Sequence, residues 1–403
     1  MPAHLPLFHD VFDRITTVIP QLRKTARTRL TLLITGILLA QSCVEAQVAE
    51  ELLQLEFTRA TVADSIARRL RRILNDTRLD PRTCYEPALA RILDWDAVLA
   101  TTRQVVLIVD ESTDAAIIHL LRISLAYRGG SLPLVWAAWE QNVAQPEGFY
   151  WQTIDALLDR VAALLPAGVT VIVVADRAYD IPPFLDRLTA RGWHWVIRLK
   201  ANASTRFLDQ RQVEQPLTTL LHRRLKRPGW RCKFRGKLFK DAGWRQVSVV
   251  ALWAEREDEA LVVITDFPPS YRVLPIYRTR FWIELGFRTD KSAGWQWEAC
   301  QVRELAHHQV LLLAMAWASL VTLCLGAEEA EHAITEREQR AARRPQHARF
   351  SLFSSGLKVL RAFLHHPQRW HLRWLLPALD APSWNHQWLT LQRQQWLRQT
   401  VRP

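Results

Sequence analysis

The chain has few cysteines, and their spacing matches neither a zinc site nor a disulfide framework. The five are odd in number and widely scattered: Cys43, Cys84, Cys232, Cys300 and Cys324. No two of them form a CxxC pair, and no internal repeat is visible along the chain. We therefore expect reduced thiols in a cytosolic protein.

Acidic residues are too few to balance the basic ones. Lys and Arg number 53 against 40 Asp and Glu, which gives a net charge of +13 and a pI near 10. Such an excess indicates a polyanionic partner, either nucleic acid or membrane phospholipid. The hydrophobic content of 49% over 403 residues is enough for two or three packed units and excludes a disordered tail protein.

No membrane segment is predicted. The apolar run taken as the longest, residues 30–40, contains Thr31, Thr35 and Gly36 and is about half the length that spans a bilayer. The first residues, MPAHLPLFHDVFDRI, carry charges where a signal peptide would be apolar. We therefore expect a cytoplasmic protein with no membrane partner, which leaves nucleic acid as the polyanion.

Polar residues at helical spacing occur in the segment YRTRFWIELGFRTDK. Four of them are separated by three, four and seven residues: Tyr277, Arg280, Glu284 and Lys291. At about 100° per residue they fall within roughly a 60° arc of one helix, which Phe281, Trp282 and Leu285 would anchor to a core. A carboxylate flanked by two cations and a phenol can hold a metal while its neighbours bind phosphates. The alternative is a solvated helix face with an ordinary ion pair between Arg280 and Glu284.

Two aspartates follow apolar runs upstream. Residues 105–109, VVLIV, are typical of a strand buried on both faces, and this run ends directly in Asp110. A second such run, residues 169–174, leads into Asp176. Buried parallel strands carry ligands and metals at their carboxyl ends. Either aspartate alone could be a turn or capping residue, but two of them together with a helical glutamate predict a carboxylate site.

Three carboxylates suit phosphodiester cleavage by two divalent ions about 3.5–4 Å apart. Mg²⁺ prefers oxygen ligands and keeps several waters, so a few carboxylates and the substrate phosphate complete its shell. One ion would activate a water or a 3′-hydroxyl, and the other would stabilise the leaving oxygen. We therefore expect Asp110, Asp176 and Glu284 to be catalytic and to bind two Mg²⁺ ions, for which Mn²⁺ can substitute.

These motifs resemble those of bacterial insertion-sequence transposases of the DDE type. Tyr277, Arg280, Glu284 and Lys291 match the signature Tyr-x2-Arg-x3-Glu-x6-Lys of the insertion sequence four group position for position. The two aspartate motifs look like DEST at residues 110–113 and DRAYD at residues 176–180. The resemblance covers roughly residues 25–360, and the triad shows no departure from the family pattern.

The resemblance implies a ribonuclease-H-like catalytic core, Mg²⁺-dependent cutting at transposon ends and strand transfer into target DNA. It also implies a homodimer in the DNA complex and a cytoplasmic, nucleoid-associated protein. Four residues would contact the DNA backbone near the cut: Tyr277, Arg280, Lys291 and Arg177.

The order of predicted elements fits that core. Residues 101–200 predict three strands, a helix, a strand, a helix and a strand, with a hairpin turn at RGGS, residues 128–131. The helix that carries Glu284 arrives only after a strand-rich interval. We therefore expect an α/β protein whose ribonuclease-H-like core, residues 101–200 and 271–330, is interrupted by a β-rich insertion at residues 201–270.

In that interval, lysines and arginines alternate with Trp230, Phe234 and Phe239. Cations at this density cannot be core, and aromatics between them offer surfaces on which bases stack; the alternative is a solvated edge sheet. Transposases of the insertion sequence four group, which this chain resembles, distort the DNA strand at the transposon end, and an aromatic side chain takes the place of a displaced base. Trp230 and Trp244 are the candidates here, because each follows a glycine that could expose it at a turn. Both could instead be packing residues.

The ends of the chain read as helical. In residues 1–100 we expect helices with a break near residues 41–43, and a later helix with Thr61 as N-cap that carries Arg68, Arg69, Arg71 and Arg72. This would suit a domain that binds the transposon ends, or a bundle whose arginines are merely solvated.

The C-terminal region, residues 331–403, should follow a buried helix near 309–325 and begin with an exposed charged helix or linker. Its tryptophans are spaced as in helices that pack in a core or an oligomer contact: Trp370, Trp374, Trp384, Trp388 and Trp396.

The sequence therefore predicts a cut-and-paste DNA transposase. Two alternatives remain open at this point. One is a ribonuclease-H-like nuclease that cuts without joining, and the other is a domesticated DNA-binding protein that has lost catalysis.

Overall fold

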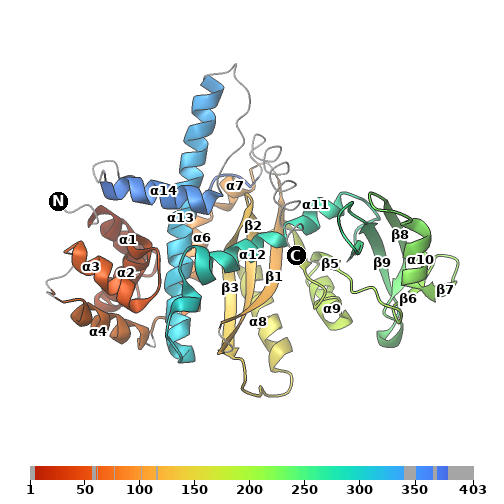
Figure 1. Ribbon diagram of the computed structural model, residues 1–403, viewed down its shortest axis with the longest axis horizontal. Helices are drawn as coiled ribbons and strands as arrows, with labels where there is room; N and C mark the ends of the chain where they lie inside the picture. Colours follow the sequence, from red (N-terminus) through yellow and green to blue (C-terminus); the bar gives the residue numbers. More distant parts are fainter. Residues whose placement is uncertain are drawn as a thin grey trace.

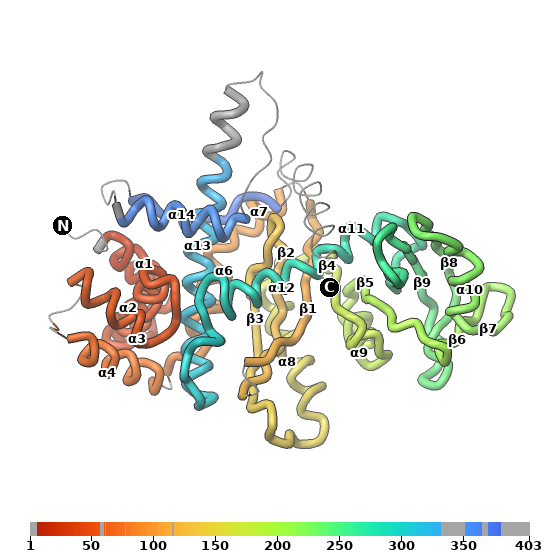
Figure 2. Tube along the Cα trace, in the orientation of Figure 1, coloured from red at the N-terminus to blue at the C-terminus, as the bar shows by residue number. Residues whose placement is uncertain are grey.

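The computed structural model describes residues 5–56, 60, 62–76, 78–100, 102–114, 117–339, 351–365 and 370–379. Within these residues a ten-stranded mixed sheet runs through the molecule, and a group of N-terminal helices lies beyond one end of it (Figure 1). A long helix, α13 (Leu305–Gln339), stands between the sheet and that helical group. Figure 2 shows the same path as a tube.

The N-terminal hundred residues are helical, as the sequence predicts. The helices are α1 (Leu5–Val18), α2 (Lys24–Ala40), α3 (Glu45–Gln54), α4 (Ala63–Leu74) and the short α5 (Pro81–Cys84), α6 (Glu86–Ile92) and α7 (Trp95–Val98). The predicted break is confirmed: Gln41 has a φ of 49°, and α2 and α3 meet at 88°. Val62 precedes α4 as its N-cap, whereas the predicted cap, Thr61, lies outside the described residues.

The first half of the sheet follows the predicted order of elements. It contains β1 (Gln104–Asp114), β2 (Ile118–Tyr127), β3 (Gly130–Glu140), α8 (Phe149–Leu164), β4 (Thr170–Ala175), α9 (Pro182–Ala190) and β5 (His194–Arg198). In space the strands are ordered β3-β2-β1-β4-β5, with β4 parallel to β1 and to β5. The predicted hairpin is confirmed, because Arg128 and Gly129 adopt positive φ values of 43° and 86° between β2 and β3.

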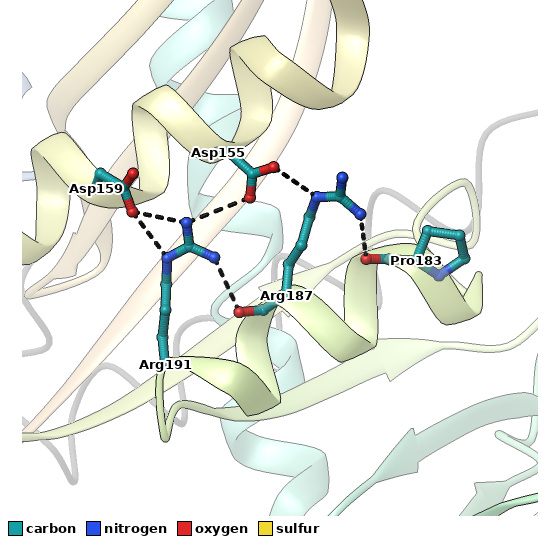
Figure 3. A network of polar contacts seen from close by, with 5 residues as sticks. All are labelled: Asp155, Asp159, Pro183, Arg187 and Arg191. Atoms are coloured by element: carbon teal, nitrogen blue, oxygen red, sulfur yellow. Dashed lines mark hydrogen bonds and ion pairs between the residues drawn. The ribbon is translucent and has the colours of Figure 1, made fainter. Parts of the chain in front are cut away.

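Ion pairs hold α8 and α9 together (Figure 3). Arg187 Nε lies 3.0 Å from Asp155 Oδ2, and Arg191 Nη2 lies 2.6 Å from Asp159 Oδ1 and 3.3 Å from Asp155 Oδ1. α8 connects β3 to β4, and α9 connects β4 to β5, so both connections move in the same direction across the sheet. Because such connections between parallel strands are right-handed, both helices lie on the same face. That leaves the other face of β1, β2 and β3 for a different helix.

The second half of the sheet comes from residues 206–265. Its elements are β6 (Arg206–Leu208), β7 (Glu214–Pro216), α10 (Leu217–Arg224), β8 (Arg231–Leu238), η1 (Lys240–Ala242), β9 (Arg245–Leu252) and β10 (Leu261–Thr265). The strand order continues β10-β9-β8-β6-β7, and β10 pairs antiparallel with β5 through Val263 and Arg198. The strand-rich interval therefore extends the sheet of the first half.

After β10 the chain forms α11 (Val273–Arg278), α12 (Phe281–Arg288), the π-helix η2 (Thr289–Ala293) and η3 (Trp297–Ala299). The prediction of one regular helix over residues 277–291 is wrong. Arg280 N–H donates to the Tyr277 carbonyl at 2.9 Å, and Trp282 N–H donates to the Thr279 carbonyl at 2.9 Å. These three-residue steps tighten the helix between α11 and α12, and the π-helix then widens it.

The predicted anchoring of α12 is confirmed in part. Phe281 and Trp282 are half-buried and pack against the core, but the fully buried residues of the helix are Ile283 and Phe287. In Figure 1, α12 runs across the strands at the centre of the molecule, on the face that α8 and α9 leave open.

The long helix α13 continues through the charged segment after residue 326, so the expected boundary between residues 330 and 331 falls inside it. It packs closely on α14 (Leu352–His365) because two glycines face each other's helix. A Cβ added to Gly326 would lie 1.9 Å from the Leu352 carbonyl oxygen, and one added to Gly356 would lie 1.9 Å from the Thr322 carbonyl oxygen. Any side chain at either position would force the helices apart.

The longest apolar stretch of the described chain lies in α13, and not at residues 30–40 as expected. By length and composition, residues Leu305–Glu331 could cross a membrane, but the apolar window is 100% buried inside the protein. α2 and α3 are long and apolar enough to cross a membrane only if the two helices, which meet at 88°, are counted as one span. Burial of this kind is typical of a core helix.

The C-terminal tryptophans that the structure describes pack without being helical. Trp370 and Trp374 lie in a segment with no helix, so the prediction of helix packing is wrong for them. Trp370 packs 4.2 Å from Phe363, and Trp374 packs edge-on against Trp317 at 6.0 Å. Trp384, Trp388 and Trp396 lie outside the described residues.

Candidate functional site

The register of β1 and β4 places Asp110 beside Asp176. The two strands pair in parallel from Gln104 and Thr170 up to Val109 and Ala175, so each aspartate follows the last paired residue of its strand. The prediction that the first strand ends at Asp110 is wrong in one respect. β1 continues to Asp114 and stays paired with β2 over that length. Only its pairing with β4 ends immediately before Asp110.

The tightened turn before α12 brings Arg280 onto the first aspartate. Arg280 Nη2 donates to Asp110 Oδ2 at 3.1 Å, and Arg280 Nη1 donates to Glu284 Oε1. The side chains of Arg280 and Asp110 are 11% and 12% exposed. The ordinary ion pair between Arg280 and Glu284 is therefore present, but it is part of a half-enclosed cluster that includes Asp110.

The three predicted catalytic carboxylates share one electrostatic environment. Burial raises the pKa of Asp110 to about 6, Arg280 opposes that shift, and the nearby charges of Asp176 and Glu284 add to it. Burial also raises the pKa of Tyr277 to about 12, with Arg280 and Arg198 opposing it. At neutral pH the phenol is therefore protonated and able to donate a hydrogen bond.

The carboxylate oxygens of Asp110, Asp176 and Glu284 are the kind of ligand that a hard cation binds, but they do not point to one common position. Among the residues that the structure describes, no three His, Cys, Asp or Glu side chains are arranged to hold one metal ion. The guanidinium of Arg280 lies instead between the oxygens of Asp110 and Glu284. Carboxylate oxygens are what Mg²⁺ prefers, so a metal would compete with Arg280 for the same atoms.

The end of the predicted stripe is held by other parts of the fold. Lys291 Nζ lies 3.2 Å from Glu298 Oε1 of η3. Its neighbour Asp290 forms an ion pair with Arg122 at 2.6 Å, and both side chains are almost fully buried. Arg122 is the cross-strand partner of Asp110, so α12 and η2 bridge β1 and β2. Since Tyr277 is 1% exposed as well, a solvated helix face does not describe this stripe.

A pocket of about 270 Å³ lies between the end of β5 and the second half of the sheet, and none of the three predicted catalytic carboxylates lines it. Arg177, which is exposed and follows Asp176, lines it together with Arg198 and Lys200 at the end of β5. Its wall on the side of the second half includes Trp253, just after β9. The pocket therefore joins the surroundings of Asp176 to the β8–β9 hairpin.

Trp230 and Trp244 lie at opposite ends of that hairpin. Trp230 is 38% exposed beside Arg227, and its carbonyl accepts from Trp253 N–H at 2.9 Å, next to the pocket. Trp244 is half-buried between η1 and β9. The glycines before them have φ values of 88° and 89°. Because eight-residue strands span about 25 Å, only the Trp230 end is near the pocket that Arg177 lines.

The arginines of α4 lie on its exposed face, opposite its buried apolar residues. Arg68 pairs with Asp64 at 3.3 Å, and Arg71 pairs with Glu45 at 2.8 Å. Arg69 and Arg72 are exposed on the same helix. Both predicted interpretations, a DNA-binding surface and a solvated bundle, agree with this placement.

Sequence reasoning missed the polar cluster around Glu111. The hydroxyls of Tyr150 and Tyr179 donate to its carboxylate, and His119 lies within hydrogen-bond distance of it. Two signals were available: Glu111 and Tyr179 lie inside the DEST and DRAYD motifs, and strand alternation directs Glu111 to the face opposite Asp110.

The parallel strand ends, the carboxylates near them and the neighbouring cations are typical of an α/β protein that acts on phosphodiesters. A protein-family model described as the transposase DDE domain matches residues 102–321, more than half of the chain. The chain therefore belongs to the DDE transposase family, whose substrate is DNA. Comparison with curated proteins gave no match.

Proposed function

We propose that this transposase cuts DNA at the ends of its own element and joins the freed strand to target DNA. The observation that carries the proposal is the register, which ends the pairing of β1 and β4 immediately before Asp110 and Asp176, with Glu284 held at the same cluster through Arg280. The fold is proposed to be ribonuclease-H-like, and the Tyr277-Arg280-Glu284-Lys291 signature is proposed to assign the chain to the insertion sequence four group.

In this proposal Asp110, Asp176 and Glu284 hold two Mg²⁺ ions. Bound Mg²⁺ would activate the attacking oxygen and stabilise the leaving oxygen. Arg280 neutralises Asp110 and Glu284 and donates to phosphate oxygens once those carboxylates are otherwise engaged. Tyr277 stays protonated and donates a hydrogen bond close to the cut, and Lys291 adds positive charge beyond α12.

The pocket provides the route for the strand. Arg177, Arg198 and Lys200 line its wall next to Asp176, where they would pair with phosphates. Trp230, whose carbonyl accepts from the N–H of the lining residue Trp253, is the side chain proposed to stack on a displaced base. Trp244 stays a weaker candidate because it lies at the distant end of the hairpin. The active species on DNA is proposed to be a homodimer, and α1–α7 are proposed to recognise the transposon ends.

One assay tests the proposal against both alternatives. The purified protein is incubated with Mg²⁺ and a DNA that carries the ends of its own element, and the products are examined for cutting and joining. Cutting followed by joining supports a transposase, and cutting alone indicates a nuclease. Specific binding with no cutting indicates a domesticated DNA-binding protein.

A further inference from the structure

The carboxylate of Glu111 is contacted by three separate elements. Tyr150 of α8 donates its hydroxyl to Oε1 at 2.5 Å, and Tyr179 of the β4–α9 loop donates to the same oxygen at 2.7 Å. His119 Nε2 of β2 lies 2.6 Å from Oε2. Burial by itself would raise the pKa of Glu111, but these hydrogen bonds hold it below its usual value. Glu111 is therefore a largely enclosed anion whose charge is satisfied by its neighbours.

Each partner in the bond between Glu111 and Tyr179 is tied to one of the proposed metal ligands. Glu111 follows Asp110 on β1 and points to the opposite face. Tyr179 belongs to the turn that begins at Asp176, because its N–H donates to the Asp176 carbonyl at 3.2 Å. Asp176 Oδ1 in turn accepts from Ala178 N–H at 2.8 Å. The hydrogen bond therefore joins the residue after Asp110 to the turn that holds Asp176.

This link lies where the backbone pairing stops. β1 and β4 are paired up to Val109 and Ala175, after which β1 continues along β2 while the other chain turns toward α9. The far end of that turn is fixed separately, because Asp180 Oδ2 accepts from Lys200 N–H at 2.7 Å. Side chains that share cations must keep their separation, and a displacement of about 1 Å is enough to impair such a site.

We propose that Glu111 is a positioning residue that sets the separation of Asp110 and Asp176 through its hydrogen bond with Tyr179. This inference rests on the proposed function, because it concerns the same two carboxylates. Glu111 acts through the backbone on either side and does not itself bind the metal.

The two tyrosines provide a matched pair of variants. Tyr179→Phe and Tyr150→Phe each remove one hydroxyl that donates to the same oxygen of Glu111, but only Tyr179 belongs to the Asp176 turn. Mn²⁺ binding is measured by electron paramagnetic resonance on the full chain bound to end DNA. Tyr179→Phe should weaken Mn²⁺ binding by about tenfold or more, in the range found when groups that orient metal ligands are removed. Tyr150→Phe should weaken it several times less.

Cleavage gives a second readout on the same variants. Tyr179→Phe should need more Mn²⁺ for half-maximal cleavage, with end-DNA binding unchanged. Glu111→Met keeps the approximate size of the side chain but removes the oxygen that accepts from Tyr179, so it should show the same shift even if Tyr179→Phe folds poorly. Asp159→Asn, which disturbs only the ion pairs between α8 and α9, is the neutral control, and thermal unfolding is recorded for every variant.

The outcomes separate this inference from the proposed function. If Asp176→Asn weakens Mn²⁺ binding while Tyr179→Phe and Glu111→Met leave it unchanged, the positioning role is wrong and the proposed function stands. Equal losses in Tyr179→Phe and Tyr150→Phe would also overturn it, because the cluster would then act only on stability. Unchanged binding in Asp110→Asn and Asp176→Asn would overturn both.

Discussion

The two halves of the ten-stranded sheet are built from different sequence patterns. In the first half, β1, β2 and β4 are buried over most of their length, so polar residues concentrate where the pairing of parallel strands ends. In the second half, β8 alternates exposed cations with buried or half-buried residues. Enclosed strands can hold carboxylates in fixed places, whereas a half-exposed strand presents charge to a large partner. We infer that the first half carries the chemistry and the second half holds the DNA.

The largest effect should come from the carboxylates of the first half. Glu284→Gln, Asp110→Asn and Asp176→Asn keep the shape of each side chain but remove the anionic oxygen that a hard cation requires. Each should lower the rate of strand cleavage by about a thousandfold or more, since metal catalysis supplies several kcal/mol. Binding to the transposon ends should stay within a fewfold of wild type, and metal chelation should stop cleavage in all proteins.

Cleavage and binding are measured on the same end DNA. If any of the three variants cuts at nearly the wild-type rate in Mg²⁺, that residue is not a ligand and the assignment of the three carboxylates fails. Loss of binding together with cleavage would instead indicate that the substitution disturbs the fold.

The next effect tests which end of the β8–β9 hairpin meets the DNA. Stacking on an aromatic side chain contributes about 1–3 kcal/mol per base, so Trp230→Ala should slow cleavage of the second strand by roughly ten- to hundredfold. Trp230→Phe should be milder, and Trp244→Ala, at the other end of the hairpin, should be close to wild type. A fluorescent base analogue beside the cleavage site reports unstacking as a rise in emission on protein binding.

That rise should be lost in Trp230→Ala and kept in Trp244→Ala. The reverse result would place the stacking residue at the distant end of the hairpin. If the double variant still unstacks the base, both tryptophans belong to the packing of the sheet.

A smaller effect should follow from the cations of β8. Arg231, Lys233 and Arg235 are exposed on this strand, and the ring of Tyr271, just before α11, lies 4.3 Å from Arg231 and 5.2 Å from Lys233. The cations are thereby connected to the segment that leads into the site. Lys233→Gln together with Arg235→Gln should weaken DNA binding alike for all sequences, because phosphate contacts position the DNA but do not specify its sequence.

The salt dependence measures that contribution. The slope of log affinity against log salt should fall by roughly 2 if each cation binds one phosphate. Lys240→Gln is the matched control, because Lys240 is held by Glu214 at 2.8 Å at the other end of the hairpin. An unchanged slope in the double variant would make this face an ordinary solvated surface.

The sequence predicts the first half of the sheet better than the helix that completes the site. Buried strands can be predicted because long apolar runs such as residues 105–109 are stable only in the protein core. Aspartates that follow two such runs lie close together when the two strands are parallel. The hairpin at residues 128–131 can be predicted because Gly129 readily adopts a positive φ.

The segment from Tyr277 to Lys291 was not predictable in the same way. The helical spacing of its polar residues is present in the sequence. The tightened turn before α12 and the π-helix after it are needed for two side chains to make contacts with β1 and β2. Arg280 must meet Asp110, and Asp290 must meet Arg122 on the next strand. Neither contact leaves a periodic signal. The Glu111 cluster was missed for a similar reason, since its members come from four parts of the chain.

The smallest effect separates two aspartates on the same face of β1. Asp114 lies four residues beyond Asp110, and burial raises its pKa to about 6, with Glu298 adding to the shift and Lys291 opposing it. The folded protein therefore disfavours the ionised form of Asp114. The stability that its protonated form contributes is fully present below about pH 4 and is lost as the pH rises through 6.

Asp114→Asn removes this cost without removing a proposed ligand. The variant should therefore unfold at a temperature a few degrees higher than wild type at pH 8 and at nearly the same temperature at pH 4, while its cleavage rate stays within a fewfold of wild type. Thermal unfolding at the two pH values, together with the cleavage assay, checks both statements. A variant that is less stable at pH 8 would mean that ionised Asp114 is stabilised by Lys291. A variant that no longer cuts would extend the catalytic cluster along β1 beyond Asp110.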